Sequence, residues 1–368
     1  MTINLQKELV SRAALLMQNA RRVVILTHMA PDGDAMGSAL AMYHWLTANS
    51  QRLTTNDQIV NVIVPNAFPA FYNWMPAADK IRIYENEAEA CNALLAEADL
   101  VICTDFNDAK RIGPVGEKML QAACKKILID HHPLCDHVEW ADVIFSYPES
   151  PAACEIVYRL LSTLHTALAD RQNSQLSTLN SQLSTNIATC LYTGLMTDTG
   201  NFSFNSTYPE LYEIIADLVR AGVEKDKIYN LIFNQYSADR VRLMGYALYR
   251  KMRIYPEHHV AVITLSADEL DRYHYQVGDT EGLVNMPLQI ADVYYSVFMR
   301  EERAKPGTPH SRIRISFRSQ GDRPVNVFAH EVFRGGGHPN ASDGELFGTI
   351  EQALGRFHAT YRKYLKTE

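Results

Sequence analysis

The sequence predicts a two-domain α/β protein, in which an N-terminal domain with a parallel sheet is joined by a helical connector to a smaller C-terminal α/β domain. Over residues 4–196, short continuous apolar runs alternate with helical patterns, as in parallel sheets covered by helices on both faces. Residues 209–252 have helical patterns without strand signals, and strand-like runs resume from about residue 258. We therefore expect the domains at 1–215 and 256–368 and the connector at 216–255.

Each expected element follows from the spacing of its apolar residues, because helices repeat every three to four residues and buried strands form short continuous runs. In the N-terminal domain, strands are expected at 23–26, 59–64, 81–84, 100–103 and 127–129, and helices at 4–21, 35–48, 88–96, 154–168 and 187–196, with a further helix ending over 119–124. In the C-terminal domain, strands are expected at 260–264, 293–299 and 313–317, and a helix at 351–364. The hexapeptide at 173–178 recurs at 180–185 and predicts a polar surface insertion between two helices.

Composition excludes several classes of protein. The 368 residues are 47% hydrophobic and 21% charged, which is typical of a globular protein. The net charge of −7 disfavours binding of long duplex nucleic acid, which needs a basic surface. Polar residues interrupt the N-terminal segment, and no apolar run reaches the length of a membrane span. The six cysteines form no CxxC pair, so we expect reduced thiols in a cytoplasmic protein and no zinc site of cysteines.

The most informative segment is an apolar run that stops at an acid, two histidines and a proline. Ile127–Ile129 has the pattern of a buried strand, and Asp130, His131 and His132 follow it directly. Pro133 cannot continue a central strand, so the three polar side chains are expected at the carboxyl end of a strand, where open α/β sheets bind ligands. Taken alone, the triplet is better explained as a strand that ends in a polar loop.

Similar strand ends occur elsewhere in the domain. The first expected strand runs into a loop with His28, Asp32 and Asp34, and a helix with a phosphate-binding type of N-terminus begins directly after it. The strand at 100–103 is followed by Asp105, and Asp198 follows an apolar segment. The carboxyl ends of parallel strands meet at one edge of the sheet. A coincidental grouping is therefore the weaker explanation.

So many carboxylates cannot stay ionised close together without cations. Oxygen-rich ligation with a few imidazoles suits Mn²⁺ or Mg²⁺ better than zinc, and the number of candidate ligands fits two ions. Two ions roughly 3.5–4 Å apart can activate water for attack on phosphorus. Asp130 could instead orient a neighbouring imidazole, and Asp136, His137 and Asp142 are read as turn or capping residues.

These segments, in this order, resemble the DHH phosphoesterase family, whose name is the Asp130-His131-His132 triplet. The second domain resembles the DHHA1 domain through the glycine-rich segment 334–342. The resemblance implies two Mn²⁺ ions, with Mg²⁺ as the alternative. It implies that His28, Asp32 and Asp105 hold one ion, and that Asp34, Asp105, His131 and Asp198 hold the other. It also implies that His132 lies beside the scissile phosphate, that Asp130 supports the histidines, and that Asp105 bridges the ions.

The composition of the glycine-rich segment independently indicates phosphate binding. Its glycines allow the backbone to approach a phosphate closely, and its histidine adds a donor that can be charged. Arginines at even spacing on the strand at 313–317 share one face, which is either a phosphate-binding face or the solvated side of an edge strand. The expected substrate-binding residues are Arg314, Arg318, Arg334, Gly336, Gly337, His338 and Asn340.

The chain lacks room for the extra domains of long processive exonucleases of this family, and it lacks the membrane segments of cyclic-dinucleotide phosphodiesterases. The resemblance therefore implies a hydrolase of the exoribonuclease type that cleaves short oligoribonucleotides and 3′-phosphoadenosine 5′-phosphate by attack of a hydroxide held by two metal ions. A phosphodiesterase for linear or cyclic dinucleotides is the alternative among enzymes, and a nucleotide-binding sensor is the alternative without catalysis. The residues leave open the direction of cleavage, the preferred substrate, and whether the protein is a monomer or a homodimer.

Overall fold

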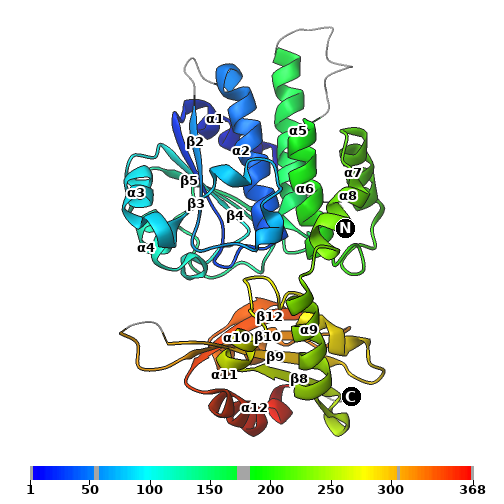
Figure 1. The fold of residues 1–368 in the computed structure, drawn as a ribbon. Helices are drawn as coiled ribbons and strands as arrows, with labels where there is room; N and C mark the ends of the chain where they lie inside the picture. The colour runs from blue at the N-terminus through cyan, green and yellow to red at the C-terminus, as the bar shows by residue number, and fades with distance from the viewer. Residues whose placement is uncertain (1–2, 54–57, 172–182, 305–306, 366–368) are drawn as a thin grey trace. The chain divides into compact units, whose positions relative to one another are not determined.

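The computed structural model describes residues 3–53, 58–171, 183–304 and 307–365. The chain divides into two compact units, Met1–Gln235 and Tyr236–Glu368 (Figure 1). This division falls inside the segment expected to connect the domains, while the expected boundaries near residues 215 and 255 and the roles of the three segments stay predictions. Most of the repeated hexapeptide lies outside the described residues.

The N-terminal unit is built on a six-stranded parallel sheet with the strand order β3-β2-β1-β4-β5-β6. Its order reverses at β1, which pairs with β2 on one side and with β4 on the other. In open parallel sheets, ligands bind outside the carboxyl ends of the strands at such a switch point. The strands are β1 (Arg22–Leu26), β2 (Ile59–Val64), β3 (Arg82–Ile83), β4 (Leu100–Thr104), β5 (Lys125–Asp130) and β6 (Val143–Ser146).

Helices cover both faces of this sheet, which explains why its central strands are almost continuously apolar. One hydrophobic cluster joins the sheet to α1, α2, α5 and α6, and another joins the opposite face to α3 and α4 (Figure 1). The helices are α1 (Lys7–Asn19), α2 (Gly33–Leu53), α3 (Tyr84–Ala96), α4 (Pro114–Gln121), α5 (Ala153–Arg171), α6 (Thr185–Asp198), α7 (Pro209–Arg220) and α8 (Lys225–Phe233).

Two glycines allow α6 to pack closely on α2. A Cβ atom added at Gly37 would lie 2.5 Å from the carbonyl oxygen of Cys190, and one added at Gly194 would lie 2.3 Å from Sγ of Cys154 and 2.8 Å from Oδ1 of Asp34. Any larger residue at either position would force the helices apart. This close approach carries the C-terminal end of α6 toward the carboxyl edge of the sheet.

The C-terminal unit holds a mixed six-stranded sheet with the order β11-β12-β10-β9-β8-β7. One hydrophobic cluster joins the sheet to α11 and α12, and a second joins it to α9 and α10 (Figure 1). The strands are β7 (Arg253–Tyr255), β8 (Val260–Leu265), β9 (Tyr295–Glu302), β10 (Arg312–Ser319), β11 (Gly336–His338) and β12 (Ala341–Phe347), and the helices are α9 (Ala238–Tyr246), α10 (Ala267–Arg272), α11 (Asn326–Phe333) and α12 (Ile350–Tyr364).

The predicted α/β class and the parallel sheet of the first domain are confirmed. Several details differ from the expectation. The helices α10 and α11 were not expected, and α4 ends at Gln121 where the helix was expected to reach residue 124. The strand expected at 81–84 is only two residues long, because α3 already begins at Tyr84. The glycine-rich segment contributes an edge strand, β11, since residues 336–338 pair with β12. Finally, β6, β7, β11 and β12 were not predicted. In β12, Gly344 and two acids interrupt the apolar pattern from which strands are read.

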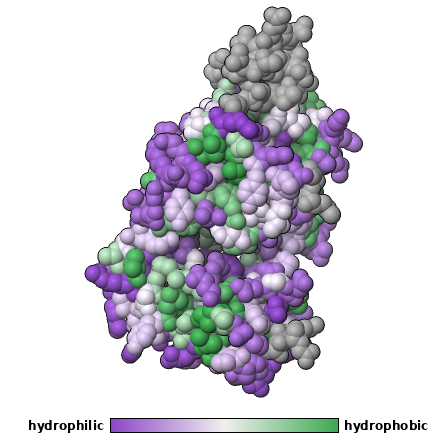
Figure 2. Space-filling model, turned by 90° about the vertical axis from the view of Figure 1, so that its right-hand side faces the viewer, coloured by the Kyte–Doolittle hydropathy of each residue, from purple (hydrophilic) through white to green (hydrophobic). Residues whose placement is uncertain are grey.

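On the face drawn in Figure 2, hydrophobic residues form several separate groups among hydrophilic ones. Among the described residues, no helix is both long and apolar enough to cross a membrane.

Candidate active site

Three segments that follow neighbouring strands, together with the end of α6, bring the predicted acids and histidines of the N-terminal unit to one edge of the sheet. His28 follows β1, Asp105 follows β4, and His131 follows β5. Several groups have ligand atoms within 4.8 Å of one another, and two of them hold the predicted metal ligands: His28, Asp32 and Asp105 form the first, and Asp34, His131 and Asp198 form the second.

In the first group, the imidazole of His28 is held from both sides. Nδ1 lies 2.9 Å from the carbonyl oxygen of Met29, and because a carbonyl only accepts, the proton of the neutral ring belongs on Nδ1. Nε2 then directs its lone pair toward Oδ2 of Asp105, at 3.2 Å, and Oδ1 of Asp32, at 3.7 Å.

The second group repeats this arrangement around His131. Nδ1 lies 3.2 Å from the carbonyl oxygen of Ser150. Nε2 faces three carboxylates, with Oδ1 of Asp105 at 3.3 Å, Oδ2 of Asp198 at 3.5 Å and Oδ2 of Asp34 at 3.7 Å. Asp105 is therefore shared between the two imidazoles.

Without bound metal, several of these crowded groups have raised pKa values, so that they keep a proton. Burial would lower the pKa of His28, but hydrogen bonds to Asp105 and Asp32 outweigh it and raise the pKa to about 10. Burial is likewise outweighed at His131, where Asp105 and the charges of Asp198 and Asp34 hold the pKa well above its usual range. Burial and the charge of Asp105 together raise the pKa of Asp34.

The donor set fits divalent cations. Each Nε2 lone pair faces carboxylate oxygens, an arrangement that is favourable only with a proton or a cation between them. Oδ1 of Asp105 is buried and lies 3.3 Å from Nε2 of His131. A cation shared by these two atoms would take the place of the proton between them.

The carboxylates of the first loop are also fixed by helix ends. Oδ1 of Asp32 accepts the amides of Asp34 and Ala35, each at 3.0 Å, so Asp32 caps α2. The N-terminus of this helix was expected to suit a phosphate group. Two of its amides instead donate to a carboxylate of the protein itself. Asp34 in turn accepts the amides of Ala153 at 2.5 Å and Cys154 at 2.9 Å, at the start of α5.

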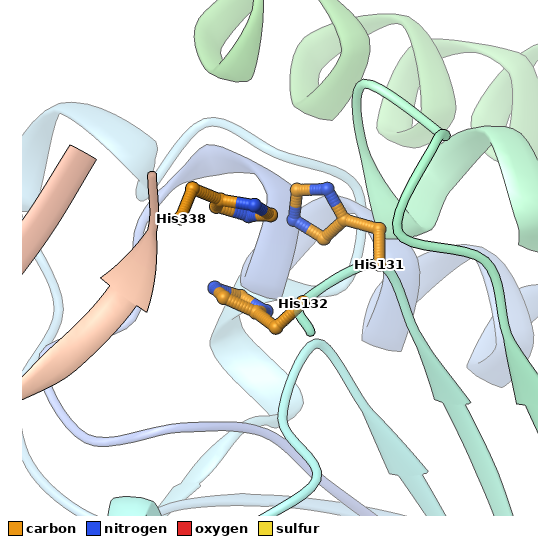
Figure 3. Close-up of side chains that lie close together, drawn as sticks. All are labelled: His131, His132 and His338. Atoms are coloured by element: carbon orange, nitrogen blue, oxygen red, sulfur yellow. The ribbon is translucent and has the colours of Figure 1, made fainter. Parts of the chain in front are cut away.

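His132 has a different environment from His131. Its Nδ1 lies 2.8 Å from Oδ1 of Asp130, which is fully buried. Figure 3 shows the imidazoles of His131 and His132 side by side after β5, and their ring centroids are 4.7 Å apart. Burial, followed by the charge of Arg111, lowers the pKa of His132.

Asp105 has a left-handed backbone, with φ +64. This region costs a residue other than glycine about 1 kcal/mol or more, and such strain often marks functional sites. The amide of Asp105 donates to the carbonyl of Ile129 at 2.9 Å, so its conformation is tied to the neighbouring strand β5.

Sequence reasoning missed two parts of this site. Asn107 donates from Nδ2 to Oδ2 of Asp130 at 2.6 Å. Glu155, fully buried on α5, accepts from Ser150, Arg159 and Tyr208. Asn107 lies two residues after Asp105, which is a signal the sequence offered. Tyr208 is 53 residues from Glu155, and no local pattern connects them.

In the C-terminal unit, the predicted glycines lie beside a strand. A Cβ atom at Gly335 would lie 1.7 Å from the carbonyl oxygen of Asp343, so only glycine allows this approach to β12. Gly337 has φ +136, which again favours glycine. Nδ2 of Asn340 donates to Oγ of Ser319 and to the carbonyl of Gly321, at 3.1 and 2.8 Å.

The predicted arginines of β10 share one face of its strand, whose burial alternates regularly. β10 lies between β12 and β9 and is therefore not an edge strand. Arg312 is bound by Glu345 at 2.7 Å and lies 3.7 Å from Glu302, whereas Arg318 donates to the carbonyl of Phe317 at 2.9 Å. Arg334 is exposed and has φ +53 at the end of α11.

The chain is similar to several known proteins. The family model described as the DHH family, N-terminal domain, matches residues 22–195. A solved structure, an exopolyphosphatase-related protein from Bacteroides fragilis, is 39% identical and has a TM-score of 0.83, with coverage of 99% of this chain and 98% of that one.

Two curated relatives are named bifunctional oligoribonuclease and PAP phosphatase NrnA. The protein from Bacillus subtilis is 24% identical over 89% of this chain and 90% of its own length, and the protein from Thermus thermophilus is 27% identical over 93% and 90%. Phosphoesterases of the DHH family are metal dependent, and the two groups of acids and histidines are candidate metal ligands in this chain. The chain belongs to the DHH family of phosphoesterases.

Proposed function

We propose that the protein is a Mn²⁺-dependent phosphodiesterase that hydrolyses RNA fragments a few nucleotides long. The observation that carries the proposal is the pair of imidazoles, His28 and His131, whose Nδ1 atoms lie against carbonyl oxygens while both Nε2 atoms face Asp105. This arrangement supports a site for two neighbouring divalent cations. The names of the relatives from Bacillus subtilis and Thermus thermophilus support the substrate class.

The proposed ligands of the first cation are His28, Asp32 and Asp105. Those of the second are Asp34, Asp105, His131 and Asp198. Oxygen ligands with one imidazole at each cation suit Mn²⁺, with Mg²⁺ as a substitute. When bound, the cations supply the charge that lowers the pKa of water and neutralises the phosphoryl oxygens.

The chain's own residues would then orient and protonate. Asp130 receives Nδ1–H of His132 at 2.8 Å, which leaves the lone pair of the neutral ring on Nε2. In the neutral ring this nitrogen accepts a proton, and once protonated it can donate to a non-bridging oxygen or give its proton to the leaving group. Asp105 acts through the cations that it would hold, and Asp130 acts through the imidazole of His132.

In the C-terminal unit, the proposed substrate residues supply amides and positive charge. Gly336 and Gly337 expose backbone beside a pocket of about 420 Å³ that Asn326 and His330 also line. The proposed contacts with the remaining phosphates, sugar and base come from Arg314, Arg318, Arg334, Gly336, Gly337, His338 and Asn340.

Removal of a phosphate from 3′-phosphoadenosine 5′-phosphate is a second proposed activity, because the same relatives carry PAP phosphatase in their names. The same ligand set serves both reactions, since each is an attack of water on a phosphate ester.

A product assay with the Mn²⁺-loaded protein tests the function. It compares a trinucleotide, an RNA of about 20 nucleotides, 3′-phosphoadenosine 5′-phosphate, a linear and a cyclic dinucleotide, and pyrophosphate. We expect the trinucleotide and the linear dinucleotide to be cleaved faster than the long RNA. Preference for the long RNA would contradict the proposal. Cleavage of pyrophosphate and of no other substrate would identify a pyrophosphatase instead.

A further inference from the structure

We propose that Asn107 is a positioning residue that holds Asp130 so that Asp130 can orient His132. The inference rests on the proposed function. Asn107 is 4% exposed and Asp130 is fully buried. Nδ2 of Asn107 lies 2.6 Å from Oδ2 of Asp130, and Oδ1 of Asp130 lies 2.8 Å from Nδ1 of His132. The three side chains thus form one chain of hydrogen bonds in which each oxygen of the central carboxylate has its own donor.

The position requires a neutral donor. Besides Asp130, the amide nitrogen of Asn107 donates to the carbonyl of Pro133 at 3.0 Å, with the carbonyl of His132 at 3.4 Å. All of these partners are acceptors, so only the NH₂ end of the amide can face them. A carboxylate at position 107 would repel Asp130, and an apolar side chain would leave one of its buried oxygens without a partner.

Two carboxylates compete for Nδ1–H of His132, and this competition gives Asn107 its effect. Oδ1 of Asp130 is 2.8 Å from this nitrogen, and Oδ1 of Asp105 is 3.5 Å from it. Asp105 is also the carboxylate shared by His28 and His131. By fixing Asp130, Asn107 directs His132 toward a carboxylate that does not face those two imidazoles and keeps it from Asp105.

The backbone of Asn107 also joins two strand ends. It lies in the segment after β4, and its carbonyl accepts from Sγ of Cys135 at 3.4 Å. Cys135 and Pro133 belong to the segment after β5. Asn107 therefore connects the two segments that carry Asp105 and His132, and its loss would free His132 without removing a metal ligand.

Steady-state kinetics with a linear dinucleotide test the inference, using Asn107→Ala and Asn107→Asp. Outer-shell partners of metal-bound histidines are worth about 10- to 100-fold in metal affinity or activity. We expect a loss of this size for His132 in kcat, with KM and bound metal nearly unchanged. Asn107→Asp should be at least as impaired as Asn107→Ala.

A matched control is available. Asn49 is also a buried asparagine of the N-terminal unit, 7% exposed, and donates to the carbonyl of Trp45 at 2.8 Å. Asn49→Ala should lower stability and leave kcat unchanged. Equal kcat losses in the variants of Asn49 and Asn107 would reduce the role of Asn107 to stability alone.

The double variant Asn107→Ala/Asp130→Ala separates positioning from an independent effect. If Asn107 acts through Asp130, the double variant is no slower than Asp130→Ala. Losses that multiply would overturn the proposal, as would a wild-type kcat in Asn107→Ala.

A readout without turnover distinguishes failure of this inference from failure of the proposed function. In ¹⁵N-labelled, Mg²⁺-loaded protein, the signal of the Nδ1 proton of His132 should be present in the wild type and in Asn49→Ala, and weakened or shifted in Asn107→Ala. An unchanged signal in Asn107→Ala would contradict the inference whatever the substrate proves to be. If the wild type cleaves no nucleotide but this signal responds, only the proposed function has failed.

Discussion

Nε2 of His28 lies 3.2 Å from Oδ2 of Asp105, while the other nitrogen of the ring lies against the carbonyl of Met29. Nε2 of His131 lies 3.3 Å from Oδ1 of the same aspartate. Each oxygen of Asp105 thus faces a different imidazole. This geometry makes Asp105 the residue on which both proposed cation positions depend.

Asp105→Asn should remove both bound metal and turnover, because a neutral amide cannot offset two cations. We expect less than about 1% of the wild-type rate. Metal analysis and the dinucleotide assay check this, with Asp136→Asn as the control, since Asp136 follows the same strand-end segment as His131 without belonging to either group. A variant of Asp105 that retains both metal and rate would refute the shared-ligand assignment.

Metal binding should release protons. The pKa of His28 is raised to about 10 and that of His131 is raised above its usual range, so both imidazoles are charged at pH 7 without metal and must be neutral as ligands. Mn²⁺ titration by calorimetry in buffers of different ionisation enthalpy should show this release, and metal affinity should fall as the pH is lowered. An enthalpy independent of the buffer would contradict the protonation scheme.

Gly194→Ala should weaken metal binding from a distance. Its Cβ would lie 2.3 Å from Sγ of Cys154 and 2.8 Å from Oδ1 of Asp34, which forces α6 and its Asp198 away from α2. We expect a loss of about 1–3 kcal/mol in the free energy of unfolding, together with weaker metal affinity. Chemical denaturation and metal titration measure the two effects.

Gly355→Ala is the matched control, because nothing lies within 4 Å of its added Cβ. This substitution on α12 should raise stability by about 0.5–1 kcal/mol and leave metal affinity unchanged. If Gly194→Ala behaved like the control, the close packing of α6 would have no role in the site.

Glu155→Ala should destabilise the N-terminal unit more than the loss of an exposed ion pair would. Glu155 is fully buried and binds Arg159, Tyr208 and Ser150, and breaking a buried ionic network costs about 3–5 kcal/mol. Because the carbonyl of Ser150 holds His131, metal affinity should also fall. Glu224→Ala, which removes an exposed pair, should cost at most about 1 kcal/mol by the same denaturation assay; comparable losses would refute the special role of the buried network.

Arg318→Ala should raise KM for the dinucleotide with little effect on kcat, because removal of a binding contact that is equal in ground and transition state acts on KM. Arg312→Ala is the comparison on the same strand face, and it should leave KM unchanged because Glu345 and Glu302 already engage this arginine. Steady-state kinetics of both variants test this. A larger increase of KM in Arg312→Ala than in Arg318→Ala would assign the substrate contact to Arg312.

Much of the fold was predictable because the central strands of the first unit are buried on both faces. Their continuous apolar runs end at His28, Asp105 and Asp130 within a few residues, so the strand ends could be located in the sequence. No local pattern shows that β1 and β4 are neighbours in the sheet, since β2 and β3 lie between them along the chain. Their proximity was inferred from the convergence of similar polar segments.

The rest depended on contacts between distant segments. Gly37 and Gly194 set the approach of two helices, and only that approach explains how Asp198 of α6 reaches a sheet edge. Asn107 carries no periodic signal because it lies in a loop. In β12, the acidic and glycine residues between its buried positions hid the strand, and with it the pairing that makes part of the glycine-rich segment a strand.

The most direct measurement of the central claim is the metal content of the purified protein together with its rate on a linear dinucleotide, before and after chelation. We expect about two divalent ions per chain in the active protein, loss of cleavage when they are removed, and recovery on addition of Mn²⁺. Cleavage at the full rate by protein from which all divalent metal has been removed would contradict the central claim.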